Sequence, residues 1–431
     1  MGDSRSDRAD FPSALHPETL AVRAQAPRTG EREHSVPLFL TSSFVFDSAE
    51  QARAMFAEEI PGSIYSRYSN PNVDELVRKL CLLEGAEDGI ATASGMAAVF
   101  ASLAALLSAG DHVLASRALF GSTHQLLTRL LPRWGITSTY ADSGASIEEW
   151  ERLVRPETKL VFVETPSNPG LDLIDLAALG ALCERRGLTL VVDNCFTTPW
   201  LQQPIRFGAH VVVHSATKFI DGQGRTLGGA VVGDARRIAD IRWFARHTGP
   251  ALSPFNAWVL SKSLETLPVR MERHCATALE IARRFEGHPE VESVRYPFLE
   301  SHPAHALARR QMSAGGGIVV LVVRGGLERA RRFLDSLELL SHSANLGDTR
   351  TIVTHPASTT HSKLSEEERQ RVGIVPGLIR ISVGLEHPSD IIADIDRALE
   401  RSAEGRAPGA RLSGLDARED AAVGSRPSAL G

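Results

Sequence analysis

The residues with the greatest chemical potential lie directly after short apolar segments that we expect to be strands. Lys218 follows the apolar segment 211–213 and two hydroxyl side chains, Ser215 and Thr217. In open α/β sheets, ligands bind beyond the carboxyl ends of the strands. The Lys218 amine is therefore placed where it could act as a nucleophile or base, although a lysine at a strand end can also simply reach solvent.

A carboxylate occupies the equivalent position of a second expected strand. Asp193 follows the apolar segment 189–192. Alone, such an aspartate could cap the next turn. Together with Lys218 it meets the requirements of pyridoxal phosphate. This cofactor binds covalently to a lysine amine and needs a carboxylate to keep its ring nitrogen protonated. The pair predicts a pyridoxal phosphate site with Lys218 as the attachment point.

A third segment, Ser94-Gly95-Met96, turns from an expected strand into an expected helix. Free backbone N–H groups at a helix N-terminus bind anions, and the hydroxyls of Ser215 and Thr217 could donate to the same group. We expect these residues to bind the cofactor phosphate, although a serine N-cap before small residues suits any tight strand-to-helix turn. The segment 222–224 is no dinucleotide fingerprint, because its third glycine is missing and it precedes a strand.

The elements that position these residues alternate between strands and helices from about residue 84 onward. This pattern is typical of βαβ units around a mostly parallel sheet. The expected strands are Gly89–Thr92, His112–Ala115, Leu160–Val163, Thr189–Val192, Val211–Val213 and Ala230–Val232. The clearest helices are Gly95–Leu107, Ile174–Arg186 and one long connecting helix, Asn256–Phe285.

The chain is expected to divide into four segments. Residues 1–62 form an extended N-terminal arm, 63–268 a large cofactor-binding domain, and 269–401 a smaller C-terminal α/β domain. The small domain contains a triple-glycine turn, a helix over Leu327–Leu337, a strand over Ile379–Val383 and a last helix ending near Arg401. Residues 402–431 have few large apolar side chains, which predicts a disordered tail.

Composition excludes several classes of partner. The chain has 431 residues and a net charge of -5, with dispersed lysines and arginines, so neither nucleic acid nor an anionic membrane surface is an expected partner. No apolar run approaches the ~20 residues that a membrane helix needs. The polar N-terminus shows no export signal, which predicts a cytoplasmic protein.

Neither cysteines nor histidines predict a metal site. The four cysteines are too widely spaced for a zinc site or a disulfide framework; they are Cys81, Cys183, Cys195 and Cys275. Cys195 lies two residues past Asp193, where we expect a packing role. His355 and His361 lack a usual ligand spacing, so we expect loop histidines near the substrate entrance and no metal.

Taken in chain order, these motifs resemble the Cys/Met-metabolism group of pyridoxal-phosphate enzymes, from about Pro17 to Leu399. The motifs are Tyr65-Ser66-Arg67 before Asn70-Pro71, Ser94-Gly95-Met96, Glu164-Thr165-Pro166-Ser167-Asn168-Pro169, Asp193-Asn194, Ser215-Ala216-Thr217-Lys218 and Arg380-Ile381-Ser382-Val383-Gly384. The resemblance implies an α/β fold of the fold type I, PLP-dependent transferase-like class, with a mostly parallel central sheet and a smaller C-terminal α/β domain.

The resemblance also implies roles for residues that the strand pattern alone does not assign. Tyr65 and Arg67 would reach the phosphate of a neighbouring subunit, which implies an oligomer, expected to be a homotetramer with shared active sites, although a dimer remains open. Asn168 would donate to the phenolic oxygen of the cofactor. Arg380 would bind the substrate α-carboxylate, with Asn345 also at the substrate.

One departure from the family bears on the reaction. Phe120 stands where most members stack a tyrosine on the cofactor, so stacking is kept but a phenol that the lyases use in proton handling is lost. Segments 221–225, 253–257 and 345–349 look most like the O-succinylhomoserine sulfhydrylase branch.

The resemblance therefore implies a sulfhydrylase-like transferase that makes homocysteine from O-succinylhomoserine or O-acetylhomoserine and sulfide, in methionine biosynthesis. Cystathionine γ-synthase or γ-lyase activity on the same scaffold, or a non-catalytic pyridoxal-phosphate-binding protein, are the alternatives.

Overall fold

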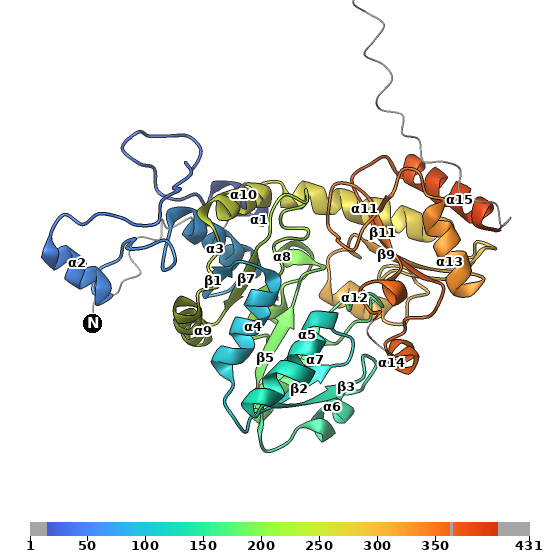
Figure 1. The fold of residues 1–431 in the computed structure, drawn as a ribbon, viewed down its shortest axis with the longest axis horizontal. Helices are drawn as coiled ribbons and strands as arrows, with labels where there is room; N and C mark the ends of the chain where they lie inside the picture. Colours follow the sequence, from blue (N-terminus) through green and yellow to red (C-terminus); the bar gives the residue numbers. More distant parts are fainter. Residues whose placement is uncertain (1–14, 363–364, 404–431) are drawn as a thin grey trace, which may run out of the picture.

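The computed structural model describes residues 15–362 and 365–403, and in them the chain forms two sheets covered by helices (Figure 1). The predicted disordered tail lies almost entirely outside the described residues. The predicted boundaries between arm, large domain and small domain remain predictions.

A seven-stranded sheet forms the centre of the larger half, in the order β1-β7-β6-β5-β4-β2-β3. β7 runs antiparallel to both of its neighbours, and the remaining pairs are parallel. The strands are β1 (Asp88–Thr92), β2 (His112–Ser116), β3 (Thr137–Ala141), β4 (Thr158–Glu164), β5 (Thr189–Asp193), β6 (Val211–His214) and β7 (Gly229–Gly233). The predicted mostly parallel central sheet is confirmed.

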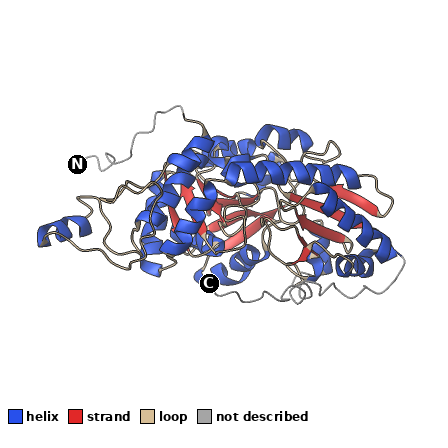
Figure 2. Ribbon diagram, turned by 90° about the horizontal axis from the view of Figure 1, so that it is seen from above, coloured by secondary structure: helices blue, strands red, loops and turns tan. Residues whose placement is uncertain are grey.

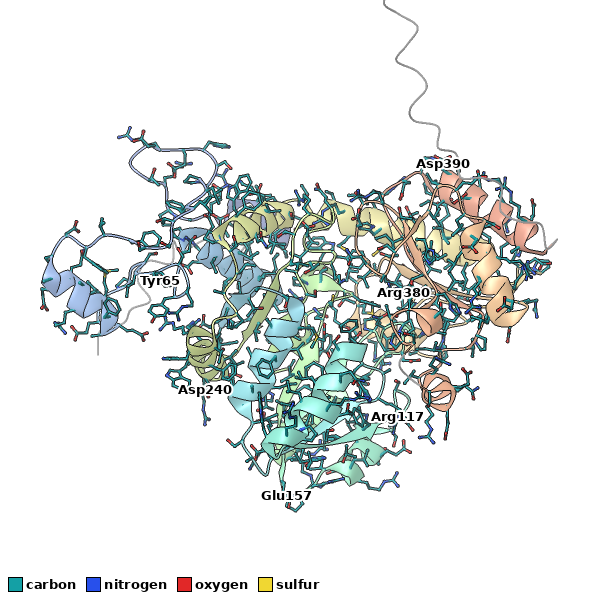
Figure 3. All side chains as sticks on the ribbon, in the orientation of Figure 1. Tyr65, Arg117, Glu157, Asp240, Arg380 and Asp390 are labelled. Carbon is teal, nitrogen blue, oxygen red and sulfur yellow. The ribbon has the colours of Figure 1, made fainter. Side chains whose placement is uncertain are left out.

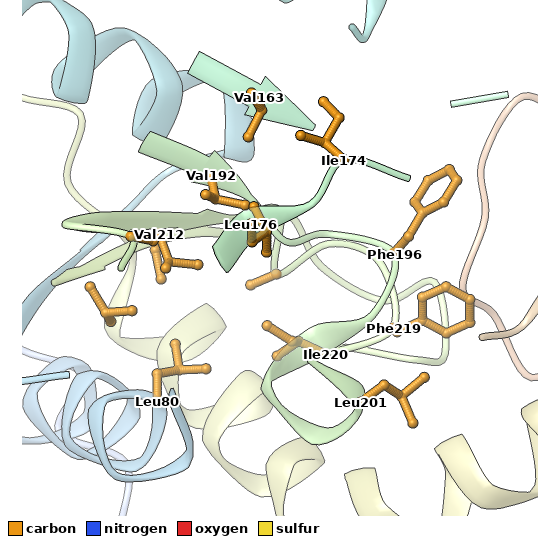
Figure 4. Close-up of a cluster of buried hydrophobic side chains, with 14 of the residues drawn as sticks. Leu80, Val163, Ile174, Leu176, Val192, Phe196, Leu201, Val212, Phe219 and Ile220 are labelled. Carbon is orange, nitrogen blue, oxygen red and sulfur yellow. The ribbon is translucent and has the colours of Figure 1, made fainter. Parts of the chain in front are cut away.

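Both faces of this sheet are buried under apolar side chains. Successive side chains of a strand point to opposite faces, so each strand contributes apolar residues to both. On one face, Val163, Val192 and Val212 pack in the cluster shown in Figure 4. On the other face, Phe162 and Val191 pack in a second cluster. The strand ends that follow these residues are therefore fixed by packing on two sides.

Helices cover the two faces of the sheet, as Figure 2 shows from above. One face packs against α3 (Pro71–Glu84), α7 (Leu176–Arg186), α8 (Thr198–Leu201) and α10 (Pro254–Leu264). The opposite face packs against α4 (Gly95–Leu106), η1 (Leu126–Leu130) and α9 (Ala235–Thr248). The shorter elements of this half are α5 (Gly121–Gln125), η2 (Leu131–Trp134), α6 (Ile147–Leu153) and η3 (Pro204–Phe207).

The start of α4 matters most for the site, and local sequence explains it. Ser94 caps the helix, since its hydroxyl accepts a hydrogen bond from the Ala97 N–H at 3.2 Å. A second helix, α7, ends just before Gly187, whose φ of 64° lies in the left-handed region that glycine adopts readily. Both helices agree with the predicted ranges to within two residues.

The smaller half contains a five-stranded sheet in the order β10-β11-β12-β9-β8. Its strands are β8 (Val291–Arg295), β9 (Ile318–Val323), β10 (Ser341–His342), β11 (Ile352–Thr354) and β12 (Leu378–Ser382). The associated helices are α11 (Leu267–Phe285), α12 (His305–Gln311), α13 (Gly326–Asp335), η4 (Pro356–Ser358), α14 (Glu366–Arg371) and α15 (Pro388–Ala403). The second α/β unit expected from the sequence is therefore present.

Three details differ from the sequence predictions. The long helix predicted from Asn256 to Phe285 is two helices, because Pro268 in the first turn of α11 has no N–H to continue the helix from α10. The edge strand β3 was not predicted, since its residues are mostly polar and only Ala141 is buried. The arm is not wholly extended, because it contains α1 (Pro17–Arg23) and α2 (Ala49–Phe56). None of the helices in the described residues is long and apolar enough to cross a membrane.

Candidate active site

Lys218 lies just past the carboxyl end of β6, and its amine is held by a residue far away in the sequence. The Nζ atom donates to Oδ1 of Asn345 at 2.6 Å. Burial lowers the pKa of this amine, and the positive charge of Arg380 adds to the effect. A lower pKa increases the neutral fraction near neutral pH, which is the form that can act as a nucleophile or accept a proton.

Arg380 on β12 lies on the other side of Asn345. Its Nη2 donates to the backbone oxygen of Asn345 at 3.0 Å, and its Nη1 donates to Oδ1 of Asn168 at 2.9 Å. The side chain is only 1% exposed, and burial lowers its pKa to about 10. Its Nε has no hydrogen-bond partner among the described residues. The structure thus brings together Lys218, Asn345, Arg380 and Asn168, all predicted from the sequence.

Asp193 ends β5, the strand next to β6. Its Oδ1 accepts a hydrogen bond from the N–H of Cys195 at 3.0 Å. Burial raises the pKa of this carboxyl to about 6. A positive charge beside Asp193 would favour its ionised form, and a protonated pyridine nitrogen would supply that charge.

Glu164 is a second carboxyl in the site, and its place in the sequence does not by itself predict a role for it. It ends β4 and pairs in register with Asp193 on β5. Burial, followed by the negative charge of Asp193, raises its pKa well above the usual range. Its Oε2 accepts a hydrogen bond from the N–H of Phe120 at 2.7 Å. The signal that could have revealed it is an acid at the end of a buried strand, in the same motif as Asn168.

This geometry makes Glu164 a positioning residue for the Phe120 loop, and a pair of variants tests that role. Glu164→Gln keeps an acceptor for the Phe120 N–H without a charge, so we expect activity within a few-fold of wild type. Glu164→Ala leaves that N–H unpaired, and we expect a loss of about 1–3 kcal/mol in the free energy of unfolding and at least about tenfold in kcat/KM. Equal damage by both variants would show instead that the charge of Glu164 is required.

The expected phosphate site is formed by the start of α4 and the end of β6. The N–H groups of Gly95 and Met96 donate to no other described residue. A Cβ on Gly95 would lie 2.6 Å from the Cβ of Ser215, so only glycine allows this approach. The Thr217 hydroxyl is bonded to the backbone of Gly228, and it would exchange its 3.2 Å bond to the Gly228 oxygen to serve a phosphate.

These residues fit pyridoxal phosphate. Unpaired N–H groups at the helix N-terminus suit a phosphate, and the carboxyl at Asp193 suits a protonated ring nitrogen. Because Asn168 uses its oxygen for Arg380, its amide N–H groups remain to donate to the phenolic oxygen. Lys218 supplies the amine for covalent attachment.

Tyr65 and Arg67 lie apart from these residues within the same chain. The Arg67 guanidinium contacts the Tyr68 ring, 4.8 Å from its centroid, and donates to the backbone oxygen of Arg246. Figure 3 shows Tyr65 near the arm and Arg380 in the region of the second sheet. Their predicted role in a neighbouring subunit's site remains a prediction.

The two loop histidines differ in position. The prediction of a place near the substrate entrance is wrong for His355, which is fully buried and bonds Ser358 and the Pro376 oxygen to hold η4. His361 instead lines a cavity next to Asn168.

The nearby cysteine and the described side chains as a whole give no sign of metal chemistry. Burial and the charge of Asp193 raise the pKa of the Cys195 thiol, so this cysteine is neutral. In the described part of the chain, no three His, Cys, Asp or Glu side chains are grouped to hold a metal ion.

Comparison with known families gives the same assignment as the geometry. The model of the family of Cys/Met metabolism PLP-dependent enzymes matches residues 18–400. The chain belongs to this family. The predicted family and cofactor are thereby confirmed, and the protein is a pyridoxal-phosphate-dependent enzyme of the Cys/Met-metabolism group.

Individual relatives narrow the comparison within the Cys/Met-metabolism family. The chain is 50% identical over 382 residues to an O-succinylhomoserine sulfhydrylase of Pseudomonas aeruginosa, covering 89% of this chain and 94% of that protein. It is 42% identical over 386 residues to an L-methionine γ-lyase of Fusobacterium nucleatum, covering 89% and 98%.

A solved structure supports the fold. A proposed O-acetylhomoserine (thiol)-lyase from Campylobacter jejuni matches with a TM-score of 0.86 and 35% identity, covering 90% of this chain and all of that chain. That structure contains N'-pyridoxyl-lysine-5'-monophosphate. The predicted fold type I class is confirmed.

Proposed function

We propose that this enzyme catalyses γ-replacement on O-succinylhomoserine, with sulfide as the nucleophile and homocysteine as the product. The observation that carries the proposal is the shared use of Asn345 by Lys218 and Arg380. A guanidinium that binds the α-carboxylate beside an amine that can remove the α-proton is the arrangement needed to act on an amino acid. The 50% identity to a sulfhydrylase supports the choice of reaction.

Each residue has a separate task in this proposal. Arg380 binds the α-carboxylate, and its preorganised bonds to Asn168 and Asn345 fix the orientation of the substrate. Lys218 would take a proton from the α-carbon and move a proton from the β-carbon, so that succinate can leave from the γ-carbon and sulfide can add there, and it would return the protons afterwards. When bound, pyridoxal phosphate would supply an electron sink for the charge that develops on the α-carbon, and Asp193 would be the residue that keeps its ring nitrogen protonated.

The main alternative is γ-elimination or cystathionine formation on the same scaffold. The relationship to an L-methionine γ-lyase favours keeping elimination as the second candidate. Phe120 argues against it, because phenylalanine lacks the hydroxyl that a proton transfer at that position would use.

A substrate panel distinguishes these reactions. O-succinyl-, O-acetyl- and O-phosphohomoserine are each offered with sulfide and with cysteine, and the products are identified by mass. We expect homocysteine from O-succinylhomoserine and sulfide to form fastest, with 2-oxobutanoate as a minor product. Cystathionine as the dominant product would assign the synthase reaction, and 2-oxobutanoate without homocysteine would assign a lyase.

We also infer a homotetramer in the cytoplasm, with active sites shared between subunits. The separation of Tyr65 from Arg380 within one chain (Figure 3), together with the contacts of Arg67 to Tyr68 and Arg246, supports shared sites. The mass of the assembly in solution tests the oligomeric state.

A further inference from the structure

A cavity of about 110 Å³ lies between the β2–α5 loop and the segment that surrounds α14. It is large enough for several water molecules, and so for a short acyl chain. Its walls are formed by Arg117, Ala118, Leu119, Gly121, His124, Asn168, His361, Arg371 and Val372. The two segments approach closely, since a Cβ on Gly121 would lie 3.3 Å from the Thr360 oxygen.

The cavity adjoins Arg380, the proposed carboxylate-binding residue, through Asn168. Asn168 lines it and also accepts the 2.9 Å hydrogen bond from Arg380. Leu119 and Gly121 in its wall flank Phe120, whose N–H is held by Glu164. A substrate bound through its α-carboxylate at Arg380 can therefore extend its side chain past Asn168 into this space.

The charge of the walls has one sign. Two arginines line the cavity, and no aspartate or glutamate is among the described lining residues. Each arginine has an acidic partner outside the walls, Asp142 for Arg117 and Glu367 for Arg371. The Arg117 side chain is 33% exposed and the Arg371 side chain is 59% exposed. Solvent and salt therefore screen the charge of Arg117 less than that of Arg371.

His361 adds a neutral polar group to the same wall. It is 4% exposed, and its Nδ1 bonds the Thr360 hydroxyl at 2.8 Å. Its Nε2 makes no hydrogen bond to another described residue. Burial, with a contribution from Arg380, lowers the pKa of the imidazole to about 4, so it remains uncharged at neutral pH. A cationic cavity with a neutral histidine suits an anionic group at the end of a short chain.

We propose that this cavity binds the distal carboxylate of the succinyl group, with Arg117 as its charged partner. The inference rests on the proposed γ-replacement and deepens it, because a succinyl ester carries a second carboxylate and an acetyl ester does not. Arg117 is preorganised for this role, since its Nε is bonded to Asp142 and its guanidinium lies 5.9 Å from the centroid of the Tyr140 ring. The remaining guanidinium N–H groups are available to a carboxylate. Arg117 therefore sets the preference for succinyl over acetyl.

The test compares two esters in the holoenzyme of Arg117→Gln. With sulfide as nucleophile, we expect kcat/KM for O-succinylhomoserine to fall on the order of 10- to 100-fold, as for loss of a hydrogen-bonded charge pair. The kcat/KM for O-acetylhomoserine should stay within about twofold of wild type. Arg117→Lys keeps the charge and should recover part of the succinyl preference. An equal fall for both esters, or no fall for either, would overturn the proposal.

Arg185→Gln is the matched control. Arg185 is also an arginine near an acid, with Glu151 at 3.9 Å, but it lies at the end of α7 that precedes β5, away from the carboxyl ends of the strands. It should leave the ratio of the two esters unchanged. Arg371→Gln should lower the succinyl value less than Arg117→Gln, because Arg371 is more exposed.

A binding measurement separates failure of this inference from failure of the proposed function. Calorimetry compares monomethyl succinate, an ester with a distal carboxylate, with methyl butanoate, an ester without one. Wild type should bind monomethyl succinate about tenfold more tightly, and Arg117→Gln should lose that difference while keeping methyl butanoate binding. If both homoserine esters are inert with wild type, the proposed reaction is wrong, and the binding of these two small esters then tests the cavity by itself. Equal binding of monomethyl succinate by wild type and variant would refute the site.

Discussion

Replacing Lys218 by alanine is expected to abolish turnover and the covalent attachment of pyridoxal phosphate. The Lys218 amine is the predicted attachment point and the group that moves the α-proton, so the variant loses two functions at once. A positioned base alone contributes about 10²- to 10⁴-fold, and we therefore expect kcat to fall at least on the order of 10³-fold.

Two measurements check the Lys218→Ala result. After borohydride reduction, the wild-type peptide that contains Lys218 should carry the mass of a pyridoxyl phosphate group, and the variant should carry none. Lys218→Arg is the control for charge, because it can still donate to Oδ1 of Asn345 but cannot form the covalent bond. It should be as inactive as alanine. Turnover that survives in either variant would sink the assignment of Lys218.

The ends of the buried strands could be predicted from the sequence for a local physical reason. Strands buried on both faces read as continuous apolar runs, and a polar residue at the end of such a run marks the edge of the sheet. Lys218 and Asp193 were found in this way, and Ser94 by its position before a helix. Each lies within a few residues of the pattern that reveals it.

Contacts between distant segments could not be predicted in the same way. Asn345 lies 127 residues from Lys218 and Glu164 lies 44 residues from Phe120, so no local pattern connects either pair. Asn345 was identified only by family resemblance, and Glu164 was given no role. The cationic cavity cannot be predicted from local sequence either, because its walls come from two distant segments, the loop that contains Arg117 and the segment around His361.

The sequence predicts the helices and strands incorrectly where the local apolar pattern is misleading or absent. The apolar periodicity continues from α10 into α11, but Pro268 removes the backbone N–H that a continuous helix would need. In β3, Thr137 is exposed and Ser138 only partly buried, because an edge strand is solvated on one side. Such a strand lacks the apolar run that revealed its neighbours.

Replacing Asp193 by asparagine is expected to damage catalysis while stabilising the cofactor-free protein. Asparagine cannot carry the negative charge that keeps the ring nitrogen protonated, so the ring accepts electrons poorly. Loss of one such preorganised electrostatic contact costs on the order of 10²- to 10³-fold in kcat. Asparagine keeps an oxygen that can accept the Cys195 N–H, so the local backbone should not change.

The stability effect follows from the raised pKa of Asp193. A carboxyl whose folded pKa is about 6, above its unfolded value, favours the folded state while protonated and loses that contribution as the pH rises through about 6. At about pH 7.5 the ionised Asp193 in cofactor-free wild type is therefore unfavourable. Asp193→Asn removes this charge and should raise the free energy of unfolding by on the order of 1–3 kcal/mol.

The pH dependence and the response to cofactor distinguish this electrostatic account from a general packing effect. In urea unfolding of the cofactor-free proteins, the advantage of Asp193→Asn should shrink as the pH is lowered from about 7.5 to about 5, because wild type regains its proton. Added pyridoxal phosphate should raise the unfolding midpoint of wild type more than that of the variant, since only wild type pairs its carboxylate with the protonated ring. If the variant is less stable than wild type at pH 7.5, burial does not destabilise the ionised Asp193 carboxylate. If the cofactor raises the unfolding midpoint of the variant as much as that of wild type, the Asp193 carboxylate does not pair with the cofactor ring.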